Sequence, residues 1–374
     1  MSDIKFCSNE NTPIVFDNGS TYLKAGFAGE ASPRVLLPSV IGRFKINQSS
    51  GPAFIGEHAL RNRGVLHLSC PILQGIVTSW SDLDAIWRHM FFKELKVDPQ
   101  DHPLLVADYP LLPSHSRELM AQFAFEEFRI PALFIADQSV LALCAYGLTS
   151  GLSVDIGKQS TCIVPVTDMQ IVPKATIKLT VGGRDVTNYL KRLLVQQGYS
   201  LNRATEHEIV RDIKEHLCFV SESPEIAVQP KSSASDLLTK YHLPDGSYLT
   251  VGTEQIIAPE LLFNPGTRNE PGFQLGRLVR DSIETCAPHV HDTLYTNITP
   301  SGGGTMFRGF VERLQKEVTR LCPAGQTVCV HSNPDRKYAV WIGGSILGSL
   351  STFSDICVTR KQYEEDGIRS VYKK

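Results

Sequence analysis

The sequence predicts an α/β fold with a duplicated plan. Strand-like and helix-like segments alternate along most of the chain, which favours mixed sheets covered by helices. Two turns have the form apolar strand, Asp-x-Gly, polar residues, apolar strand; they begin at Asp17 and Asp155, a separation on the scale of a domain. The 374 residues are enough for two or three domains with sizeable cores. We therefore expect one such turn in each half of the fold.

The first turn offers groups that bind phosphate. It presents Asp17, Gly19 and Ser20, and Lys24 follows shortly after. A glycine lets a phosphate approach the backbone N–H groups closely, and a lysine supplies a point charge. The second turn repeats the pattern. A single turn of this kind is usually just a hairpin turn, so it is the pair that predicts a nucleotide phosphate clamped between two halves.

The composition excludes several classes of protein. The 42% apolar and 20% charged residues are typical of a globular chain, and the net charge of −2 gives no general attraction to nucleic acid or anionic membranes. The nine cysteines are scattered without a Cys-x-x-Cys pair, which argues against a disulfide framework and a zinc site. The longest apolar region, Ala132–Tyr146, is interrupted by Asp137 and Gln138 and is too short for a membrane span. We expect a soluble cytoplasmic protein without a signal peptide, with the nucleus as a second location.

In the first half of the chain, periodicity and capping residues predict an exposed loop and then alternating helices and strands. These are a loop over 45–51, a helix capped by Ser81, a strand over 104–107, a helix from Ser114 to about Phe128, a strand over 132–136 and a helix over 138–146. The last helix is either a connection between two lobes that acts as a hinge or a buried packing helix.

The second half adds two Gly-rich segments that precede helices. Gly182-Gly183 opens one helix, and Gly302–Gly304 precedes a helix over 310–321, where the turn is either an anion or nucleotide-edge site or a flexible joint. Between them we expect a helix over 208–220, a polar loop over 221–237 and a hairpin over 241–251. The polar face of the helix over 208–220 carries Arg211, Lys214 and Glu215, and is either solvated or a ligand surface.

With its Gly-containing turns in this order, the sequence resembles the actin family nearly from end to end. The similarity rests on long motifs in a fixed order: Asp17–Ser20 with Lys24–Gly29, Gly75–Val77 before Trp80, Gly183–Asp185, Glu208–Glu215, Leu243–Gly246 and Trp341–Leu347. Two further segments, Pro131–Ile135 and Tyr363–Gly367, are more similar to centractin, the dynactin filament subunit, than to conventional actin.

The resemblance implies the actin-like two-lobed ATPase fold, with duplicated ribonuclease H-like domains around a cleft that holds ATP or ADP with Mg²⁺ or Ca²⁺. The small lobe would comprise residues 1–145, with an inserted subdomain at about 39–70, and the C-terminal return 339–374. The large lobe would comprise residues 146–338, with an inserted subdomain at about 182–270.

The resemblance also assigns roles to residues. Gly19, Ser20 and Lys24 would contact the phosphates, and Asp17 and Asp155 would hold the cation, largely through water. Gly157 would lie close to the terminal phosphate, and Gln138 would position the attacking water. The nucleoside side would be lined by Gly183, Arg211, Lys214, Glu215, Gly303, Met306 and Lys337. This arrangement fits phosphoryl transfer, which depends on positioning and charge neutralisation.

The second turn departs from the family pattern. Lys158 replaces an acidic residue, Gln159 a glycine, and Cys162 the histidine that helps to order the catalytic water; in the first turn Thr21 replaces a glycine. Loss of a water-positioning or proton-transfer group slows catalysis by about 10²- to 10⁴-fold. We therefore expect weak or absent ATP hydrolysis, the alternative being an active ATPase that polymerises.

Three segments bear on assembly. The loop between Arg43 and Phe54 is shorter than the family's subunit-gripping loop, residues 265–270 are polar where filament-forming members carry an apolar plug, and the chain lacks the usual final Cys-Phe. We expect limited self-polymerisation and partners among other actin-like or cytoskeletal proteins, with no direct nucleic-acid contact and no membrane insertion. A chromatin-associated actin homologue is the alternative.

Overall fold

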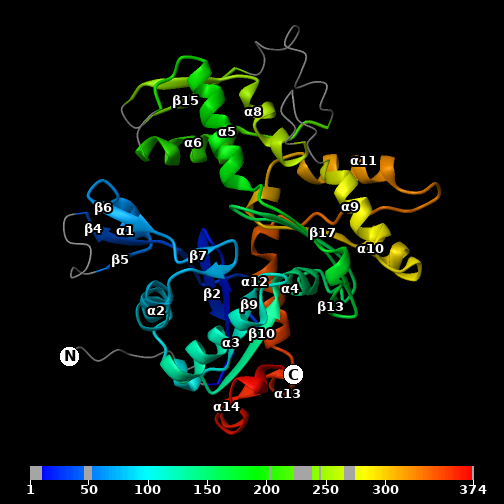
Figure 1. Cartoon of the computed structure of the whole chain (residues 1–374). Coiled ribbons are helices and arrows are strands. Elements are labelled where there is room, and N and C mark those ends of the chain that lie inside the picture. The colour runs from blue at the N-terminus through cyan, green and yellow to red at the C-terminus, as the bar shows by residue number, and fades with distance from the viewer. Residues whose placement is uncertain are drawn as a thin grey trace. The chain divides into compact units, whose positions relative to one another are not determined.

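The computed structural model describes residues 11–45, 53–201, 204–222, 238–243, 246–264 and 274–372. The chain divides into two compact units, each described here by itself. Unit 1 comprises Met1–Thr149 and Tyr338–Lys374, and unit 2 comprises Ser150–Lys337. Both units combine a mixed sheet with helices (Figure 1), which confirms the predicted α/β class. The predicted inserted subdomains stay predictions.

Unit 1 is built on a six-stranded sheet with the order β18-β10-β9-β1-β2-β3. Strands β1, β9 and β10 run parallel, and the other neighbours pair antiparallel. The turn at Asp17 joins β1 to β2, as predicted. The strands are β1 (Ile14–Asn18), β2 (Tyr22–Phe27), β3 (Val35–Pro38), β9 (Leu104–Asp108), β10 (Ala132–Asp137) and β18 (Val358–Thr359).

Helices and small sheets complete unit 1. The helices are α1 (Glu57–Arg61), α2 (Trp80–His89), α3 (Ser114–Gln122), α4 (Gln138–Cys144), α12 (Ala339–Gly348), α13 (Phe353–Ile356) and α14 (Arg360–Asp366). The shorter helical segments are η1 (Met90–Leu95), η2 (Pro99–Asp101), η3 (Phe123–Glu127) and η9 (Gly367–Tyr372). The small sheets contain β4 (Ile41–Phe44), β5 (Phe54–Ile55) and β6 (Leu66–Ser69), and the pair β7 (Ile72–Leu73) and β8 (Ile76–Val77).

The alternation of side chains along β1 divides the core of unit 1 into two layers. Phe16 packs on one face against Trp87 and other aromatic rings, with the Phe16 and Trp87 ring centroids 5.1 Å apart. Val15 packs on the other face with Leu141 of α4 and Trp341 of α12. A Cβ at Gly343 would lie only 1.8 Å from the carbonyl oxygen of Leu141, so glycine lets α12 lie directly on α4.

Unit 2 repeats the hairpin plan. Its sheet has the order β13-β12-β11-β17, with β14 also paired to β12; β11 and β17 are parallel, and the turn after Asp155 joins β11 to β12. The strands are β11 (Gly151–Ile156), β12 (Thr161–Thr167), β13 (Gln170–Ile171), β14 (Ile177–Leu179) and β17 (Ile298–Ser301). A separate hairpin pairs β15 (Thr239–His242) with β16 (Tyr248–Val251), as predicted.

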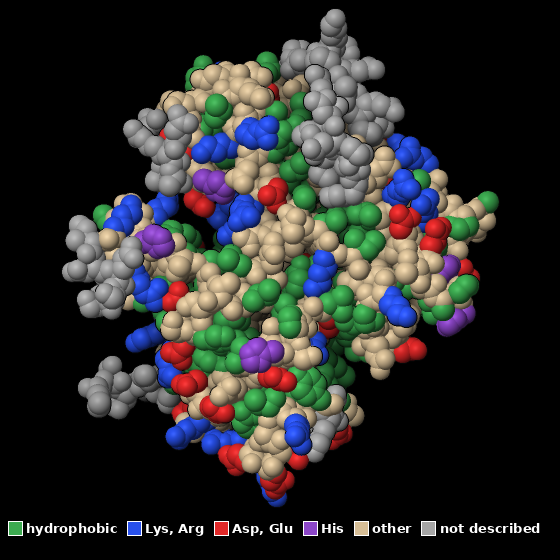
Figure 2. Space-filling model, viewed as in Figure 1, with side chains coloured by type: hydrophobic (Ala, Val, Ile, Leu, Met, Phe, Trp, Pro, Cys, Tyr) green, Lys and Arg blue, Asp and Glu red, His purple; other side chains and the backbone are tan. Residues whose placement is uncertain are grey.

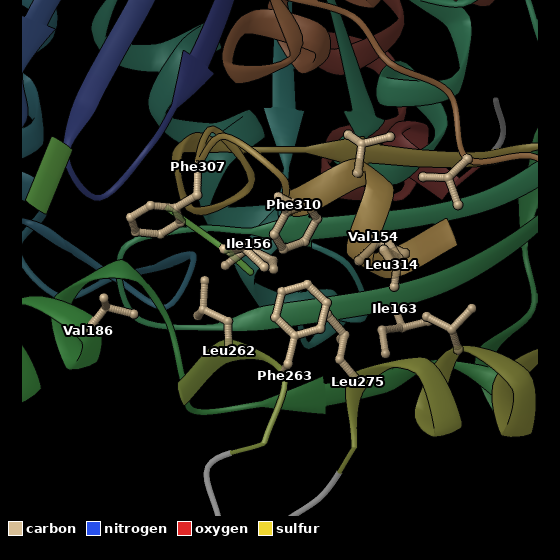
Figure 3. Close-up of a cluster of buried hydrophobic side chains, with 14 of the residues drawn as sticks. Val154, Ile156, Ile163, Val186, Leu262, Phe263, Leu275, Phe307, Phe310 and Leu314 are labelled. Carbon is tan, nitrogen blue, oxygen red and sulfur yellow. The ribbon is translucent and has the colours of Figure 1, made fainter. Parts of the chain in front are cut away.

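Helices pack on the unit 2 sheet and bury a continuous core. Figure 3 shows Val154, Ile156 and Ile163 of the sheet among other apolar side chains, including Phe310 of α11 and Phe263, which follows η5. The helices are α5 (Gly183–Gln196), α6 (Ala204–Leu217), α8 (Glu254–Ile257), α9 (Leu275–Glu284), α10 (His291–Thr296) and α11 (Phe310–Leu321). The short segments are η4 (Pro173–Ala175), η5 (Pro259–Leu262), η6 (Pro288–Val290), η7 (Gly303–Thr305) and η8 (Arg336–Tyr338).

Several predicted element boundaries are wrong. Ser79, and not Ser81, caps α2: its hydroxyl accepts a hydrogen bond from the Asp82 N–H at 3.3 Å. The helix from Ser114 has Pro113 at its cap and changes to a π-helical segment at Phe123. The helix predicted over 208–220 is α6 and ends at Leu217.

The Gly-rich turn does not lead directly into α11. It forms η7, and α11 begins later, after Gly309, whose φ is +82°. The helix predicted over 138–146 is α4, which ends at Cys144. Most of each loop predicted over 45–51 and 221–237 lies outside the described residues.

The described helices and the face shown in Figure 2 bear on membrane insertion and surface charge. None of the helices in the described ranges is long and apolar enough to cross a bilayer. On the face shown in Figure 2, basic and acidic side chains are interspersed.

Candidate functional site

The turn between β1 and β2 brings three predicted site residues of unit 1 together. Asp17 is only 2% exposed, at the end of β1. The Lys24 Nζ donates to Asp17 Oδ2, and the Gln138 Nε2 donates to Asp17 Oδ1 at 3.4 Å. A carboxylate, an ammonium and an amide from three elements therefore meet at the carboxyl edge of the parallel strands.

The backbone of the same turn is kept open by Gly19. A Cβ at Gly19 would lie 2.7 Å from the carbonyl oxygen of Tyr22, so a side chain does not fit there. Ser39 donates to the Gly19 carbonyl at 2.6 Å, and Cys70 donates to the Ser20 carbonyl at 3.2 Å. Ser39 and Cys70 support the turn from outside it. No local pattern identifies them, because both are distant in sequence.

The turn between β11 and β12 carries Asp155 and Gly157. Asp155 Oδ1 accepts a hydrogen bond from the Ser301 hydroxyl at 2.9 Å, so the carboxylate lies beside the Gly-rich segment that follows β17. Cys162 pairs directly with Asp155 across the two strands. Directly paired residues project to the same face. The buried thiol of Cys162 is therefore a neighbour of the candidate cation ligand.

Gly157 connects this turn to the start of α5. Its carbonyl accepts from the Gly183 N–H at 2.9 Å, and its own N–H donates to the Ser160 carbonyl at 2.9 Å. A Cβ at Gly182 would lie 2.8 Å from the Gly157 oxygen and from the Gln159 nitrogen. The two Gly-containing segments, predicted separately, thus form one close backbone contact.

Lys214 of α6 belongs to the same cluster. It is 9% exposed, and its Nζ donates to the Gly183 carbonyl at 3.3 Å. Burial lowers the pKa of Lys214, an effect that Glu215 opposes. Of the two interpretations of this helix face, simple solvation is wrong for Lys214.

Arg211 and Glu215 lie on the more exposed part of α6. The Arg211 guanidinium lies 3.0 Å from Glu208 Oε2 and 3.7 Å from Glu215 Oε1. Lys214 Nζ lies 3.9 Å from the same Glu215 oxygen. The three predicted residues therefore form a mixed-charge ladder, with donors and acceptors for a polar ligand.

The Gly-rich segment and Lys337 are linked through Arg336. The buried Arg336 guanidinium donates to the Thr305 carbonyl at 2.8 and 3.2 Å, and the Arg336 carbonyl accepts from the Gly302 N–H at 3.3 Å. Lys337 follows as an exposed residue in η8. Gly303 has no heavy atom within 4 Å of an ideal Cβ, so there is open space beside it. Met306 ends η7 and is half-buried.

The residues that depart from the family pattern have distinct surroundings. The exposed Lys158 is held by its backbone, whose carbonyl accepts from the Arg184 N–H at 2.7 Å. The pKa of His207 on α6 is lowered mainly by burial, and the positive charge of Lys158 lowers it further. Lys158 therefore contributes to the electrostatic potential at α6. The Gln159 side chain is buried, and its Oε1 accepts no hydrogen bond from the described residues.

The carboxylates do not form a metal cage made of protein alone. Among the described residues, no three His, Cys, Asp or Glu side chains lie close enough together to hold a metal ion. Asp17 is in unit 1 and Asp155 is in unit 2. Each of the two carboxylates offers oxygen ligands of the kind that Mg²⁺ prefers.

Nearly the whole chain matches a known family. The model of the family described as Actin matches residues 8–374, which is nearly all of the sequence. Members of this family generally bind ATP or ADP with a divalent metal. The two units with their mixed sheets fit the family's two-lobed α/β fold, as predicted. The chain therefore belongs to the actin family.

Proposed function

We propose that this chain binds ATP or ADP with Mg²⁺ or Ca²⁺ as a structural ligand, hydrolyses ATP weakly or not at all, and acts as an assembly subunit. The observation that carries the proposal is the repeated hairpin. In each unit an aspartate and a glycine lie at the end of a strand that has a parallel neighbour. In unit 1 Lys24 donates to the aspartate of this turn, and in unit 2 Lys214 donates to Gly183, which adjoins the turn.

The phosphates and the cation use groups from both units in this proposal. Lys24, now paired with Asp17, supplies positive charge, while Gly19 and Ser20 offer a backbone that a phosphate can approach. Asp17 and Asp155 would hold the cation largely through water, and Gly157 would lie near the terminal phosphate. The cation neutralises phosphate charge when it is bound.

The nucleoside side belongs to unit 2. Gly183 and Lys214 provide a buried polar contact, and Arg211 and Glu215 provide charged groups four residues apart on one face of α6. Gly303 leaves open space beside the backbone. Met306 and Lys337 are held near it, because Arg336, the neighbour of Lys337, donates to the carbonyl of Thr305, the neighbour of Met306. Planar and ribose groups would fit against such a surface, with glycines where the backbone must stay uncovered.

Weak hydrolysis is supported by the residues around Asp155 and Gln138. Cys162, a buried thiol, stands opposite Asp155, where the family resemblance places a histidine. Lys158 adds positive charge where the resemblance places a carboxylate. Gln138 is retained, but its amide contacts Asp17, and the residue that pairs with Asp155 is a thiol in place of an imidazole, so water activation is expected to be slow.

The first experiment measures the bound nucleotide. Protein purified in Mg-ATP is denatured at intervals over hours, and ATP, ADP and free phosphate are quantified. We expect ATP that stays ATP. Conversion at a rate typical of actins would overturn weak hydrolysis, and absence of nucleotide would overturn the proposed site.

Two lysine variants make the binding test specific. Lys24→Met removes the ammonium beside Asp17 and should weaken ATP binding by about 10- to 100-fold, the value of one hydrogen bond to a charged group. Lys45→Met is the matched control, because Lys45 is exposed and its ammonium donates to the Gly64 carbonyl, away from Asp17. Ser20→Ala, a smaller change, should weaken binding without disturbing the fold.

The assembly role rests on the family and on the sequence. We propose partners among other actin-like or cytoskeletal proteins in the cytoplasm, and a centractin-like subtype that belongs to dynactin. Of the segments that favour limited self-polymerisation, most of the loop between Arg43 and Phe54 (residues 46–52) and all of residues 265–270 lie outside the described residues. Sedimentation in Mg²⁺ and salt should leave the protein in the supernatant at concentrations where actin pellets, and robust pelleting would contradict this proposal.

A further inference from the structure

Two neighbouring parallel strands of unit 1 end in aspartates that the proposed site does not use. The register pairs Asp17 with Ala107, Ala107 with Ala136, and Asp108 with Asp137. Because side chains alternate along a strand, Asp108 and Asp137 project to the sheet face opposite Asp17. They are one residue past the level of Asp17, at the point where β10 turns into α4.

Asp137 is a buried carboxylate with uneven hydrogen bonding. It is 9% exposed, and its Oδ1 accepts from the Ser139 N–H at 2.9 Å, which caps α4. Its Oδ2 is buried and accepts no hydrogen bond from the described residues. A buried charge without full compensation destabilises a fold.

The charged groups around Asp137 compensate its charge only in part. The Arg117 Nε of α3 donates to Asp108 Oδ2 at 2.6 Å, so this guanidinium serves the neighbouring carboxylate. The other elements packed against β10 and α4, namely α12 and β18, carry no titratable side chain. Burial raises the pKa of Asp137 to about 6 and Asp108 adds to the increase, against the lowering effects of Ser139 and Arg117.

The cap places the next residue in the candidate site. Gln138 is the first residue of α4, and its amide reaches Asp17 Oδ1 at 3.4 Å. Asn and Ser cap helices as well as Asp does. What Asp137 adds is a charge, and a hydrogen bond to a carboxylate is about twice as strong as a neutral one.

We propose that Asp137 is a positioning residue whose carboxylate fixes the turn from β10 into α4 and thereby holds the Gln138 amide against Asp17. This inference rests on the proposed nucleotide site. When Asp137 is protonated, the cap weakens, Gln138 loosens from the candidate cation ligand, and the bound nucleotide leaves faster.

The test follows the release of etheno-ATP, a fluorescent ATP analogue, from full-length protein between pH 5.5 and pH 7.5. Wild type should release it about 3- to 10-fold faster at pH 5.5, with a midpoint near 6, as expected when a charged hydrogen bond becomes a neutral one. Asp137→Asn should release at the fast rate throughout. The terminal phosphate of the nucleotide also titrates near pH 6 and affects both proteins alike. The quantity compared is therefore the difference in release rate between wild type and Asp137→Asn at each pH.

A double-mutant cycle separates positioning from a structural role. If Asp137 acts through Gln138, Asp137→Asn should have no further effect in a Gln138→Ala background. The matched control is Asp98→Asn, because Asp98 makes the same kind of cap, accepting from the Gln100 N–H at 3.0 Å. Its profile should follow wild type. Asp137→Ser provides a second uncharged cap if the Asn variant folds poorly.

The outcomes distinguish this inference from the proposed function. The role of Asp137 would be overturned if Asp137→Asn bound etheno-ATP normally and kept the wild-type pH profile of release. It would also be overturned if the effects of Asp137→Asn and Gln138→Ala on the release rate multiplied. Either outcome would leave the nucleotide site intact. Failure of wild type to bind etheno-ATP would overturn the site and the inference together.

Discussion

At the scale of single residues, burial decides which charges are unusual. Asp137 and Lys214 both lie under 10% exposed, and burial shifts their pKa values toward the neutral form, upward for the acid and downward for the base. Lys214 is compensated by a carbonyl and by Glu215, whereas one oxygen of Asp137 has no such partner in the described structure.

Asp137→Asn should stabilise the protein at neutral pH. The pKa of Asp137 rises from 3.8 to about 6 on folding, so the folded state binds the proton more tightly. Stability contributed by this group is therefore fully present below pH 3.8 and is lost as pH rises through 6. The substitution removes a penalty of up to about 3 kcal/mol at pH 7.5.

Urea unfolding of wild type and Asp137→Asn at pH 7.5 and pH 5 measures this effect. The gain in unfolding free energy should be largest at pH 7.5 and smaller at pH 5. Equal unfolding free energies of the two proteins at pH 7.5 would show that the carboxylate is solvated or paired in solution.

At the scale of elements, α11 shows how one helix organises unit 2. Its Arg313 is almost fully buried, over the ring of Phe263. The guanidinium donates to Glu260 at 2.7 Å, to Glu317 at 2.6 Å and to the Ser221 carbonyl at 2.7 Å. Arg313 therefore joins α11 to η5 and to the segment after α6.

Arg313→Ala should destabilise unit 2 by about 3–5 kcal/mol, because it leaves Glu260 and Glu317 partly buried without their cation. Arg360→Ala is the matched control: Arg360 and Glu364 form an exposed pair four residues apart on α14, worth at most about 0.5 kcal/mol. Thermal unfolding followed by circular dichroism compares them. Similar melting temperatures for the two variants would contradict the view that Arg313 organises this unit.

Element boundaries show the limit of local patterns. The helix predicted over 310–321 is α11 with those bounds. Its apolar residues recur with helical spacing, and Gly309, whose backbone is not helical, sets its first residue. The sequence predicts Ser81 as the cap of α2, but Ser79 caps it; both serines have a hydroxyl that can cap a helix, and only the backbone geometry decides between them.

At the scale of the whole molecule, the two units allow a test of the proposed nucleotide site. Each unit has its own core and one of the two hairpins. If one nucleotide contacts both hairpins, both units gain stability on binding, by about 2.7 kcal/mol at a hundredfold excess over the dissociation constant.

Differential scanning calorimetry with Mg-ATP and with EDTA measures the gain. We expect every unfolding transition to move to higher temperature with Mg-ATP. A shift confined to one transition would mean that only one hairpin binds nucleotide. Lys24→Met should reduce the shift, and Lys45→Met should retain it.

The sequence by itself determined the α/β class, the two Asp-x-Gly hairpins, the positions of the glycines and the family. These depend on periodicity and on backbone conformations that neighbouring residues set. Only the tertiary structure decided that Lys214 reaches Gly183, that Ser301 supports Asp155, and that Arg336 holds the Gly-rich segment. It also decided that Asp137 is buried. Burial and contacts between residues far apart in the chain arise from packing. The electrostatic surroundings of a buried side chain therefore depend on distant residues, and no local sequence pattern predicts them.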